Sequence, residues 1–318
     1  MLIQVKKTLD TYPGRVKIFT MKTVAFLGLG LMGRLMAANV ARGGFRVRTY
    51  DPNGRGNCRS EAEAARGADV LITMVPDGRA VRAAIAAALP GLRRGAIVVD
   101  MSSSDPATTR ALGRRLRSKG IGMLDSPVSG AKAKAADGTL ALMVGGDAAL
   151  LRRVRPILRT MGSEIFHTGA LGSGHATKAL NNYLGAAGTI AGMEALIVGE
   201  KFGLDPRTLI DVINASTGKN STTERKIPQQ VFTRAFASGF ALSLMTKDVG
   251  IAEGLARAVG ARTPYLRQTL KIWRAALSRL PAGADHTEVY RYLKRLPLPS
   301  RAAASPRRRS RRTPRRSS

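Results

Sequence analysis

The sequence predicts an α/β fold in which a doubly wound parallel sheet is followed by an all-α domain. Three observations predict it. An apolar strand runs into glycines spaced G-x-G-x-x-G, buried apolar runs alternate with helical segments up to about residue 173, and only helical patterns follow. Such a sheet has right-handed crossovers, and its ligands bind beyond the carboxyl ends of the strands.

The first strand–helix–strand unit spans residues 24–51 and carries a mechanical role for each glycine. Gly28 permits a tight turn, Gly30 lets the backbone approach a pyrophosphate, and Gly33 lets helix and strand pack closely. The helix N-terminus offers free N–H groups and a partial positive charge to phosphates. The unit therefore predicts a Rossmann-type dinucleotide site formed by Gly28, Leu29, Gly30, Leu31, Met32, Gly33 and Asp51.

The acid that ends the second strand indicates which dinucleotide binds. Asp51 lies 18 residues beyond Gly33, where a carboxylate can accept hydrogen bonds from both ribose hydroxyls. A carboxylate there would repel a 2′-phosphate, which favours NAD over NADP. Arg55 lies close enough in sequence to keep NADP as the alternative.

Five further strands are expected after this unit, together with helices that begin at clear signals. Asp105 and Pro106 provide an N-cap and a first-turn proline for one of these helices. The turns after the strands, at 75–76, 102–103 and 126–131, would all line the binding edge. The expected strands are Asp69–Val75, Ala96–Asp100, Ile121–Asp125, Leu140–Val144 and Ile165–His167.

From Gly174 the strand signals stop, which predicts a separate all-helical domain. One stretch, Ala179–Gly199, is apolar nearly all round, but it carries Asn181, Asn182, Thr189 and Glu194, which are costly in hydrocarbon. A helix buried between domains is favoured over a membrane span. The expected helices are His175–Gly203, Pro206–Ala215, Lys226–Phe236, Leu242–Val259, Tyr265–Ser278 and Thr287–Leu293.

These patterns divide the 318 residues into four parts. Residues 1–20 are an N-terminal extension without a secretory signal, 21–173 are the NAD-binding domain, 174–296 are the helical domain, and 297–318 are a disordered Arg-rich tail. Cys58 is the single cysteine, so no intrachain disulfide can form and a reducing compartment, the cytoplasm, is expected.

The net charge of +31 raises the question of an anionic partner. The tail holds eight arginines and no acid, and the rest of the chain still carries +23 without them. No basic stretch of the body interleaves with aromatic residues, so a solvated basic surface is favoured, and nucleic acid is expected at most through the tail. His167, His175 and His286 share no metal-ligand spacing, and no metal is expected.

Several segments resemble, in order, the motifs of the β-hydroxyacid dehydrogenases, a family that includes 3-hydroxyisobutyrate dehydrogenase and tartronate semialdehyde reductase. The segments cover about residues 22–296. They are FLGLGLMG, MVPDG, VVDMSSSDP, LDSPVSGAKAKAADGTLALMVGG, GSGHATKALNNYL and KFGLDP. The resemblance implies hydride transfer between a nicotinamide cofactor and a small β-hydroxy acid, in the cleft between a Rossmann-type and a helical domain.

Within that resemblance, Lys178 looks like the family's catalytic lysine and Asn182 lies four residues on. The spacing puts both side chains on one helix face, about one turn apart. A partly desolvated lysine can take a proton from the alcohol or give one to the carbonyl, because burial lowers its pKa. Asn182 would orient the amine or bond the reacting oxygen. A surface lysine is the alternative, which the apolar flanks disfavour.

Ser129 and Gly130 resemble the family's clamp for the substrate carboxylate, although an ordinary turn explains them too. Ala131 departs from the family pattern, which has a second glycine there, and the added methyl group would reshape the pocket. The substrate-binding residues expected are therefore Ser129, Gly130 and Ala131.

Four more positions resemble residues that touch the cofactor in the family: Val75, Pro76, Ser103 and Lys247. Lys247 could equally form a structural ion pair with Asp248. The segment Gly283–Glu288 is interpreted as a helix cap, with a role near the active site as the less favoured alternative.

The residues around Lys178 also distinguish this chain from related enzymes with other reactions. Decarboxylating 6-phosphogluconate dehydrogenases carry His-Asn where this chain has Asn181-Asn182, and related imine reductases usually lack the lysine. The sequence thus favours an NAD-dependent dehydrogenase that interconverts a small β-hydroxy acid and its semialdehyde or keto acid, in a homodimer or homotetramer. The alternatives are an NADP-preferring reductase of a small aldehyde acid and a non-catalytic, nucleic-acid-associated scaffold.

Overall fold

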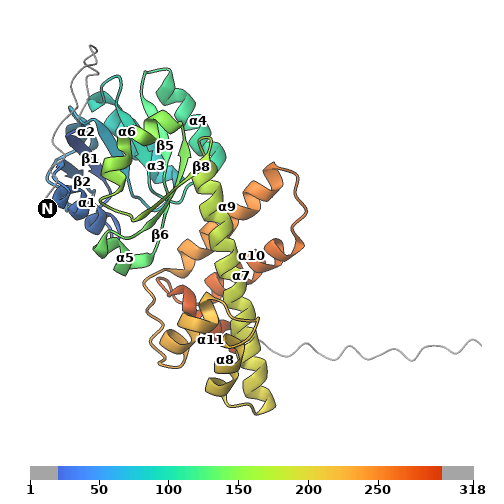
Figure 1. Ribbon diagram of the computed structural model, residues 1–318. Coiled ribbons are helices and arrows are strands. Elements are labelled where there is room, and N and C mark those ends of the chain that lie inside the picture. Colours follow the sequence, from blue (N-terminus) through green and yellow to red (C-terminus); the bar gives the residue numbers. More distant parts are fainter. Residues whose placement is uncertain (1–20, 296–318) are drawn as a thin grey trace, which may run out of the picture.

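The computed structural model describes residues 21–295, so the expected extension 1–20 and tail 297–318 lie outside the described residues. A sheet with helices on both faces comes first, and a helical bundle follows it (Figure 1). The last strand, β8 (Glu164–Gly169), ends four residues before the long helix α7 (Ser173–Phe202) begins. The predicted fold class is confirmed.

The sheet has the strand order β2-β1-β3-β4-β5-β7-β6, with β8 paired to β7. Because the chain moves from β1 to β2 on one side and returns to β3 on the other, the switch point lies beside β1, as in dinucleotide-binding sheets. The strands are β1 (Thr23–Leu27), β2 (Arg46–Tyr50), β3 (Val70–Thr73), β4 (Ile97–Asp100), β5 (Gly122–Asp125), β6 (Val128–Ser129) and β7 (Ala141–Gly146).

One expectation about the sheet needs correction. β1 through β5 pair in parallel, but β7 runs antiparallel to both β5 and β6. The short strand β6, which the sequence analysis treated as part of a turn, runs in the same direction as β5, and the chain reverses through α5 (Ala131–Asp137) before β7 enters the sheet between them. The sheet is therefore parallel except where β7 meets β5 and β6, because β8 pairs with β7 in parallel.

Alternating side chains of β1 explain why helices cover both faces. Val24 and Phe26 belong to one core with α1 (Gly33–Arg42) and α6 (Ala148–Leu158), while Ala25 and Leu27 belong to the opposite core. Successive strand residues point to opposite faces, so a strand that is apolar throughout is buried on both sides. The second core is completed by α2 (Glu61–Ala65), α3 (Gly78–Ala88) and α4 (Pro106–Arg117).

The helical part is built around α7, a helix of 30 residues and about 45 Å. It packs against every other helix of this part except the short 3-10 helix η3 (His286–Glu288), which contacts other helices of the bundle, and Figure 1 shows α7 running the length of the bundle. The others are α8 (Pro206–Asn214), η2 (Thr222–Val231), α9 (Leu242–Ala258), α10 (Pro264–Arg279), η3 (His286–Glu288) and α11 (Val289–Lys294).

Two expectations about these helices are wrong. The helix expected at Lys226–Phe236 is a π-helix that ends at Val231, since Pro228 lacks an N–H and Arg234 and Phe236 adopt positive φ. The apolar helix expected to be buried between the domains lies at the domain junction only in its first turns. Farther along, it exposes a stripe of apolar side chains.

The carboxylate of Asp125, at the end of β5, holds the first turn of α7. It accepts hydrogen bonds from the backbone N–H groups of Gly172 and His175, both at 2.7 Å. Gly174 keeps room for this contact, because a Cβ there would lie 2.1 Å from the carbonyl oxygen of Met143. A fully buried acid of the sheet thus caps the helix that carries Lys178.

Substitution of Asp125 by alanine should lower the free energy of unfolding by about 2–4 kcal/mol, because two buried N–H groups lose their acceptor. Asp147→Ala is the matched control. Asp147 also accepts two backbone N–H bonds at a helix start, but it is exposed, so a clearly smaller loss is expected. Urea unfolding measures the free energy of unfolding of both variants, and equal losses would show that burial adds nothing to the contribution of the Asp125 contact.

Candidate active site

A cleft of about 580 Å³ opens beyond the carboxyl ends of β1, β3 and β4 and faces the start of α9. Its walls are mostly apolar, as in sites for cofactors. The structure brings most of the expected cofactor-binding residues into this one cleft. They are Gly28, Gly30, Leu31, Met32, Gly33, Asp51, Val75, Pro76, Ser103 and Lys247.

The three glycines are required for three different reasons. Gly28 has a φ of +96°, and a Cβ there would lie 2.3 Å from the carbonyl oxygen of Met74. A Cβ on Gly33 would lie 2.0 Å from the carbonyl oxygen of Gly28, so that glycine lets α1 approach the turn. A Cβ on Gly30 would meet no protein atom within 4 Å, and Gly30 lines the cleft. The space that Gly30 leaves open is thus available to a ligand.

Leu29 differs from its expected role as a cleft residue. Its side chain is buried in the core of the sheet, and its contribution is a backbone N–H that donates to Asp51 Oδ2 at 2.8 Å. The buried carboxylate of Asp51 also accepts from the backbone and side chain of Asn53. Burial raises the pKa of Asp51, but these hydrogen bonds and the charge of Arg55 outweigh it and hold the pKa below its usual value.

Asp51 therefore remains ionised and keeps acceptor capacity. Three donors use three of the roughly four acceptor positions of a carboxylate, which leaves about one for a ligand hydroxyl. Arg55 lines the same cleft and is exposed. The residues thus fit a dinucleotide, with a negative charge where the adenosine ribose would lie.

A second buried acid, Asp100, shapes the loops on the other side of the cleft. It accepts from Thr73 Oγ1 at 2.9 Å, from the Ser102 backbone at 3.0 Å and from Ser104 Oγ at 2.8 Å. Ser102 Oγ in turn accepts from the backbone N–H of Val75. The ends of β3 and β4, which carry Val75 and Ser103 into the cleft, are therefore tied together.

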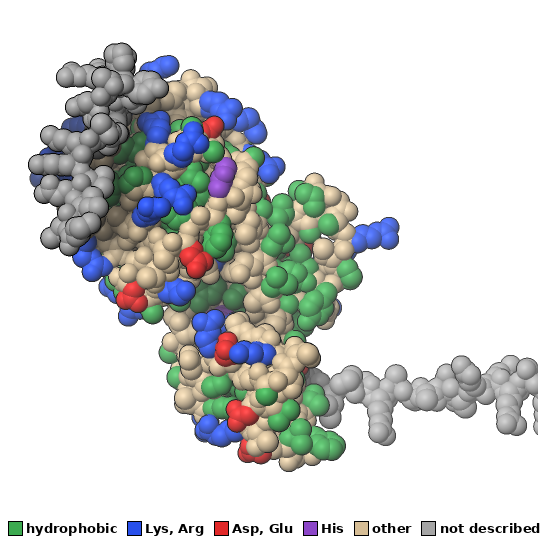
Figure 2. Space-filling model, viewed as in Figure 1, with side chains coloured by type: hydrophobic (Ala, Val, Ile, Leu, Met, Phe, Trp, Pro, Cys, Tyr) green, Lys and Arg blue, Asp and Glu red, His purple; other side chains and the backbone are tan. Residues whose placement is uncertain are grey.

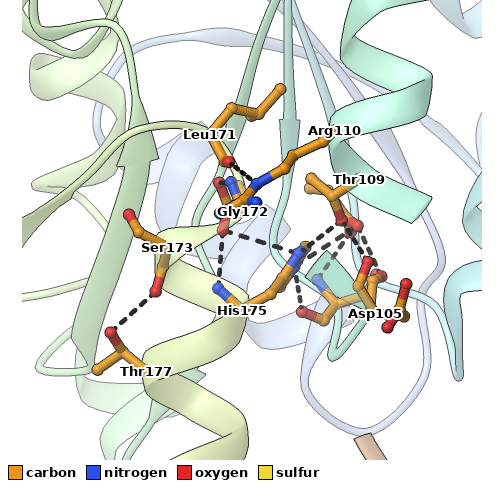
Figure 3. Close-up of polar contacts among 12 residues, drawn as sticks. Asp105, Thr109, Arg110, Leu171, Gly172, Ser173, His175 and Thr177 are labelled. Carbon is orange, nitrogen blue, oxygen red and sulfur yellow. Dashed lines mark hydrogen bonds and ion pairs between the residues drawn. The ribbon is translucent and has the colours of Figure 1, made fainter. Parts of the chain in front are cut away.

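His175 joins these loops to the start of α7. Figure 3 shows its ring turned toward Thr109 of α4. Its Nδ1 lies 2.9 Å from Thr109 Oγ1, and its Nε2 lies 3.1 Å from the carbonyl oxygen of Ser102. The ring is fully buried and lies within 4 Å of Asp100 and Asp125. His175 is thus part of the domain junction.

Lys178 lies one turn beyond His175, and it is half-buried. Burial lowers the pKa of its ammonium group, the carboxylate of Asp248 raises it, and the charge of Lys247 lowers it further, for a net lowering. Asn182 does not donate to Lys178; its Nδ2 donates to Asp248 Oδ2 at 2.5 Å. Neither Lys178 nor Asn182 lines the cleft, but Asp248 does, and this carboxylate accepts the hydrogen bond of Asn182 and acts on Lys178 through its charge.

Lys247 forms the ion pair that the sequence left open, and its side chain also reaches the cleft. Its Nζ lies 3.0 Å from Asp248 Oδ1 as an ion pair, and it also lines the cleft. The same Nζ donates to the backbone carbonyl of Ser103 at 2.8 Å. Lys247 therefore links α9 of the helical part to a loop of the sheet across the cleft.

The expected carboxylate clamp lies outside the lining of this cleft. Ser129 ends β6 and Gly130 precedes α5 (Ala131–Asp137), on the side of the sheet nearest the helical part in Figure 1. Among the described residues, no hydrogen bond joins the triplet to Lys178 or Asn182. Ala131 has a φ of +57°, in the left-handed region that disfavours every residue with a Cβ. A glycine at this position would be free of that strain.

The sequence analysis missed two acids that support the site and two residues of the cleft wall. Asp100 and Asp125 each end a predicted strand, which was a usable signal, whereas Gly239 and Phe240 line the cleft from the helical part and gave none. Within residues 21–295 no cluster of three or more His, Cys, Asp or Glu residues could hold a metal ion. Over the same residues, no helix has both the length and the apolar character needed to cross a membrane.

Two family models match nearly the whole of the described chain. Residues 23–169 match the model described as the NAD binding domain of 6-phosphogluconate dehydrogenase. Residues 172–293 match the model described as NAD-binding of NADP-dependent 3-hydroxyisobutyrate dehydrogenase.

Individual relatives agree with these matches. A probable 3-hydroxyisobutyrate dehydrogenase of Mycobacterium tuberculosis is 40% identical over 285 residues, which are 85% of this chain and 95% of the relative. An NAD-dependent L-serine dehydrogenase of Pseudomonas aeruginosa is 35% identical and covers 85% of this chain and 97% of the relative. A structure titled Mycobacterium tuberculosis 3-hydroxyisobutyrate dehydrogenase with L-serine has a TM-score of 0.79 at 37% identity, covering 86% and 99%.

Ala131→Gly should raise the free energy of unfolding by about 0.5–1 kcal/mol, because glycine adopts a positive φ without strain. Ala133→Gly, at an exposed interior position of α5, is the control and should lower it by about 0.5–1 kcal/mol. Thermal and urea unfolding of the two variants measures the difference in sign. A loss of stability in both variants would show that Ala131 is not strained.

Proposed function

The chain belongs to the β-hydroxyacid dehydrogenase family and is an NAD(P)-dependent oxidoreductase of CH–OH groups, and we propose that its substrate is a small carboxylate bearing a hydroxymethyl group on the α carbon. Three relatives support the substrate class: dehydrogenases of 3-hydroxyisobutyrate, of L-serine and of 2-(hydroxymethyl)glutarate. All three named substrates share the unit HOCH₂–CH(R)–COO⁻. The product would then be the corresponding semialdehyde.

We propose that the cofactor is held by the glycine turn and Asp51 at one end of the cleft, and by Val75, Pro76, Ser103 and Lys247 at the other. The open space in front of Gly30 and the free acceptor position of Asp51 support this orientation. What the dinucleotide supplies is a hydride acceptor for the oxidation, and a hydride donor for the reverse reaction.

The observation that supports the proposed mechanism best is the environment of Lys178. Its lowered pKa increases the share of neutral amine, which can take the proton of the substrate hydroxyl as the hydride leaves carbon. In the reverse direction the ammonium form returns that proton to the carbonyl oxygen. Asp248, charge-coupled to Lys178 and hydrogen-bonded to Asn182, keeps the pKa from falling further.

We propose that Ser129, Gly130 and Ala131 bind the substrate carboxylate. Gly130 has a φ of +142° and precedes the first turn of α5, so the backbone there turns sharply. The proposal depends on the resemblance of this segment to the family motif, because the triplet lies outside the lining of the cleft. The methyl group of Ala131 would then select among the groups R at the α carbon.

A homodimer or homotetramer is the proposed assembly. One face of α7 carries four exposed apolar side chains, because their spacings are close to whole numbers of helical turns. They are Leu180, Leu184, Val198 and Phe202, and Phe202 is 82% exposed. Hydrophobic side chains also gather on the helical part in Figure 2, whereas basic side chains are scattered over the sheet domain without forming one patch in that view. A second copy would cover the apolar face.

The proposed compartment is the cytoplasm. The chain has one cysteine, Cys58, which remains a free thiol, and a reducing compartment keeps it so.

Wild-type enzyme should have a higher kcat/KM with NAD than with NADP, because the ionised Asp51 repels a 2′-phosphate. Asp51→Asn removes the charge at constant shape and should narrow the ratio about tenfold. Glu61→Gln, which alters another acid of the same cleft, should leave the ratio near the wild-type value. A wild-type preference for NADP would contradict the role given to Asp51.

Lys178→Ala should lower kcat by roughly 10²–10⁴ and leave NADH affinity nearly unchanged, because the cofactor is held by other residues. Lys178→Arg should recover little, since a guanidinium does not release its proton near neutral pH. In the wild type, oxidation should speed up as pH rises through the lowered pKa of Lys178, and reduction should slow down. The pH profiles of kcat/KM in both directions measure this.

The matched control is Lys201→Ala, which removes an exposed lysine near the far end of the same helix and should keep both profiles. Near-wild-type turnover in Lys178→Ala would exclude Lys178 as the group that transfers the proton.

A further inference from the structure

The short segment Ser238–Phe240, between η2 and α9, forms part of the cleft wall. Gly239 and Phe240 line the cleft opposite the loops of the sheet, next to Leu244 and Lys247 of α9. The segment has no regular secondary structure apart from a single bridge between Ala241 and Asp285, and Gly239 has a φ of +83°. Its position must therefore be fixed by other contacts.

Those contacts converge on the carboxylate of Asp285, more than 40 residues later in the chain. Asp285 Oδ2 accepts from the backbone N–H groups of Gly239 at 3.0 Å and Phe240 at 3.3 Å. Ser238 Oγ donates to the same carboxylate, at 2.8 and 2.9 Å from its two oxygens. All three residues of the segment are thus bonded to one acid.

His286 adds a second hold on the segment. Its backbone N–H donates to the carbonyl oxygen of Phe240 at 2.9 Å, and its ring Nδ1 lies 3.1 Å from the same oxygen. The ring meets Phe240 edge-on at a centroid distance of 5.8 Å and stacks on the buried Trp273. The Phe240 side chain is therefore backed by the core of the helical part.

Asp285 also performs the role that the sequence predicted for it, as a helix cap. Its Oδ1 accepts from the backbone N–H of Thr287 at 2.9 Å and from Thr287 Oγ1 at 2.6 Å, which caps η3. One carboxylate, 9% exposed, thus binds donors on two sides. A cap alone would need only the Thr287 side, so the bonds to the cleft segment require a separate explanation.

We propose that Asp285 is a positioning residue for cofactor binding, which fixes the Ser238–Phe240 segment so that Phe240 closes the cleft wall beside Lys247. The carboxylate acts through the backbone of the segment and does not itself line the cleft. This proposal rests on the cofactor site described above and not on the identity of the hydroxy acid.

Asp285→Asn tests the proposal at constant shape. Both carboxylate oxygens face N–H or O–H donors, so the amide NH₂ must oppose donors on one side. Exchange of the Gly239 and Phe240 amide hydrogens, measured by NMR in the cofactor-free protein, should become about tenfold faster. The NADH dissociation constant, measured by fluorescence, should rise about fivefold or more.

The matched control is Asp205→Asn. Asp205 caps α8 through the backbone and hydroxyl of Thr208, just as Asp285 binds Thr287, but it touches no residue of the cleft segment. The control should leave amide exchange at 239–240 and NADH affinity unchanged. If Asp285→Asn does not fold, Ser238→Ala removes one bond to the same carboxylate from the segment side and should give a smaller change of the same kind.

A double-mutant cycle separates positioning from general stability. Phe240→Ala should raise the NADH dissociation constant. The double variant Phe240→Ala, Asp285→Asn should have a dissociation constant no higher than that of the single variant that binds NADH less tightly. Additive effects, or unchanged exchange and NADH affinity together with a lower melting temperature, would overturn the proposal. NADH binding needs no hydroxy acid, so an error in the proposed substrate leaves this test intact.

Discussion

The attachment of α7 to the sheet through Asp125 is the constraint on which the rest of the site depends. The carboxylate bonds the N–H groups of Gly172 and His175, and His175 then bonds Ser102 and Thr109. Lys178 follows one helical turn later, so its distance from the cleft is set by these contacts. A helix joined to the sheet only by its linker would leave the amine free to move relative to the cofactor loops.

Electrostatics at the far side of the cleft depend on one other acid. Asp248 is almost fully buried and interacts with Lys247, with Asn182 and, through its charge, with Lys178. Burial alone would drive the pKa of Lys178 down, and the carboxylate counters that effect. Since Lys247 also bonds the Ser103 carbonyl, any motion that separates α9 from the sheet loops would change the charges around Lys178. Domain geometry and proton affinity are therefore coupled.

Features of the fold and the site could be predicted from the sequence where the residues that determine them lie close together in the chain. The glycine turn and Asp51 were predicted because strand, turn, helix and acid occupy one stretch of 28 residues. The strand at β7 and the helix around Pro228 were predicted, but the antiparallel direction of the strand and the π-helical form of the helix were not, because both depend on partners that the local pattern does not name. Asp125, Asp248 and Asp285 act across dozens of residues, and no spacing rule identifies such pairs.

Two features of the domain junction differ in what they say about catalysis: its buried contacts and the lysine beside them. A scaffold with this fold would need the buried contacts of Asp125 and His175 for stability, but it would have no use for a lysine with a lowered pKa. Moving a lysine from solvent into a partly desolvated site disfavours its charged form, and nothing in the packing of α7 requires an amine there. At Lys178 a neutral side chain of similar length would serve packing better. Proton transfer, the role proposed for Lys178, would give a function to an amine that is kept at this cost.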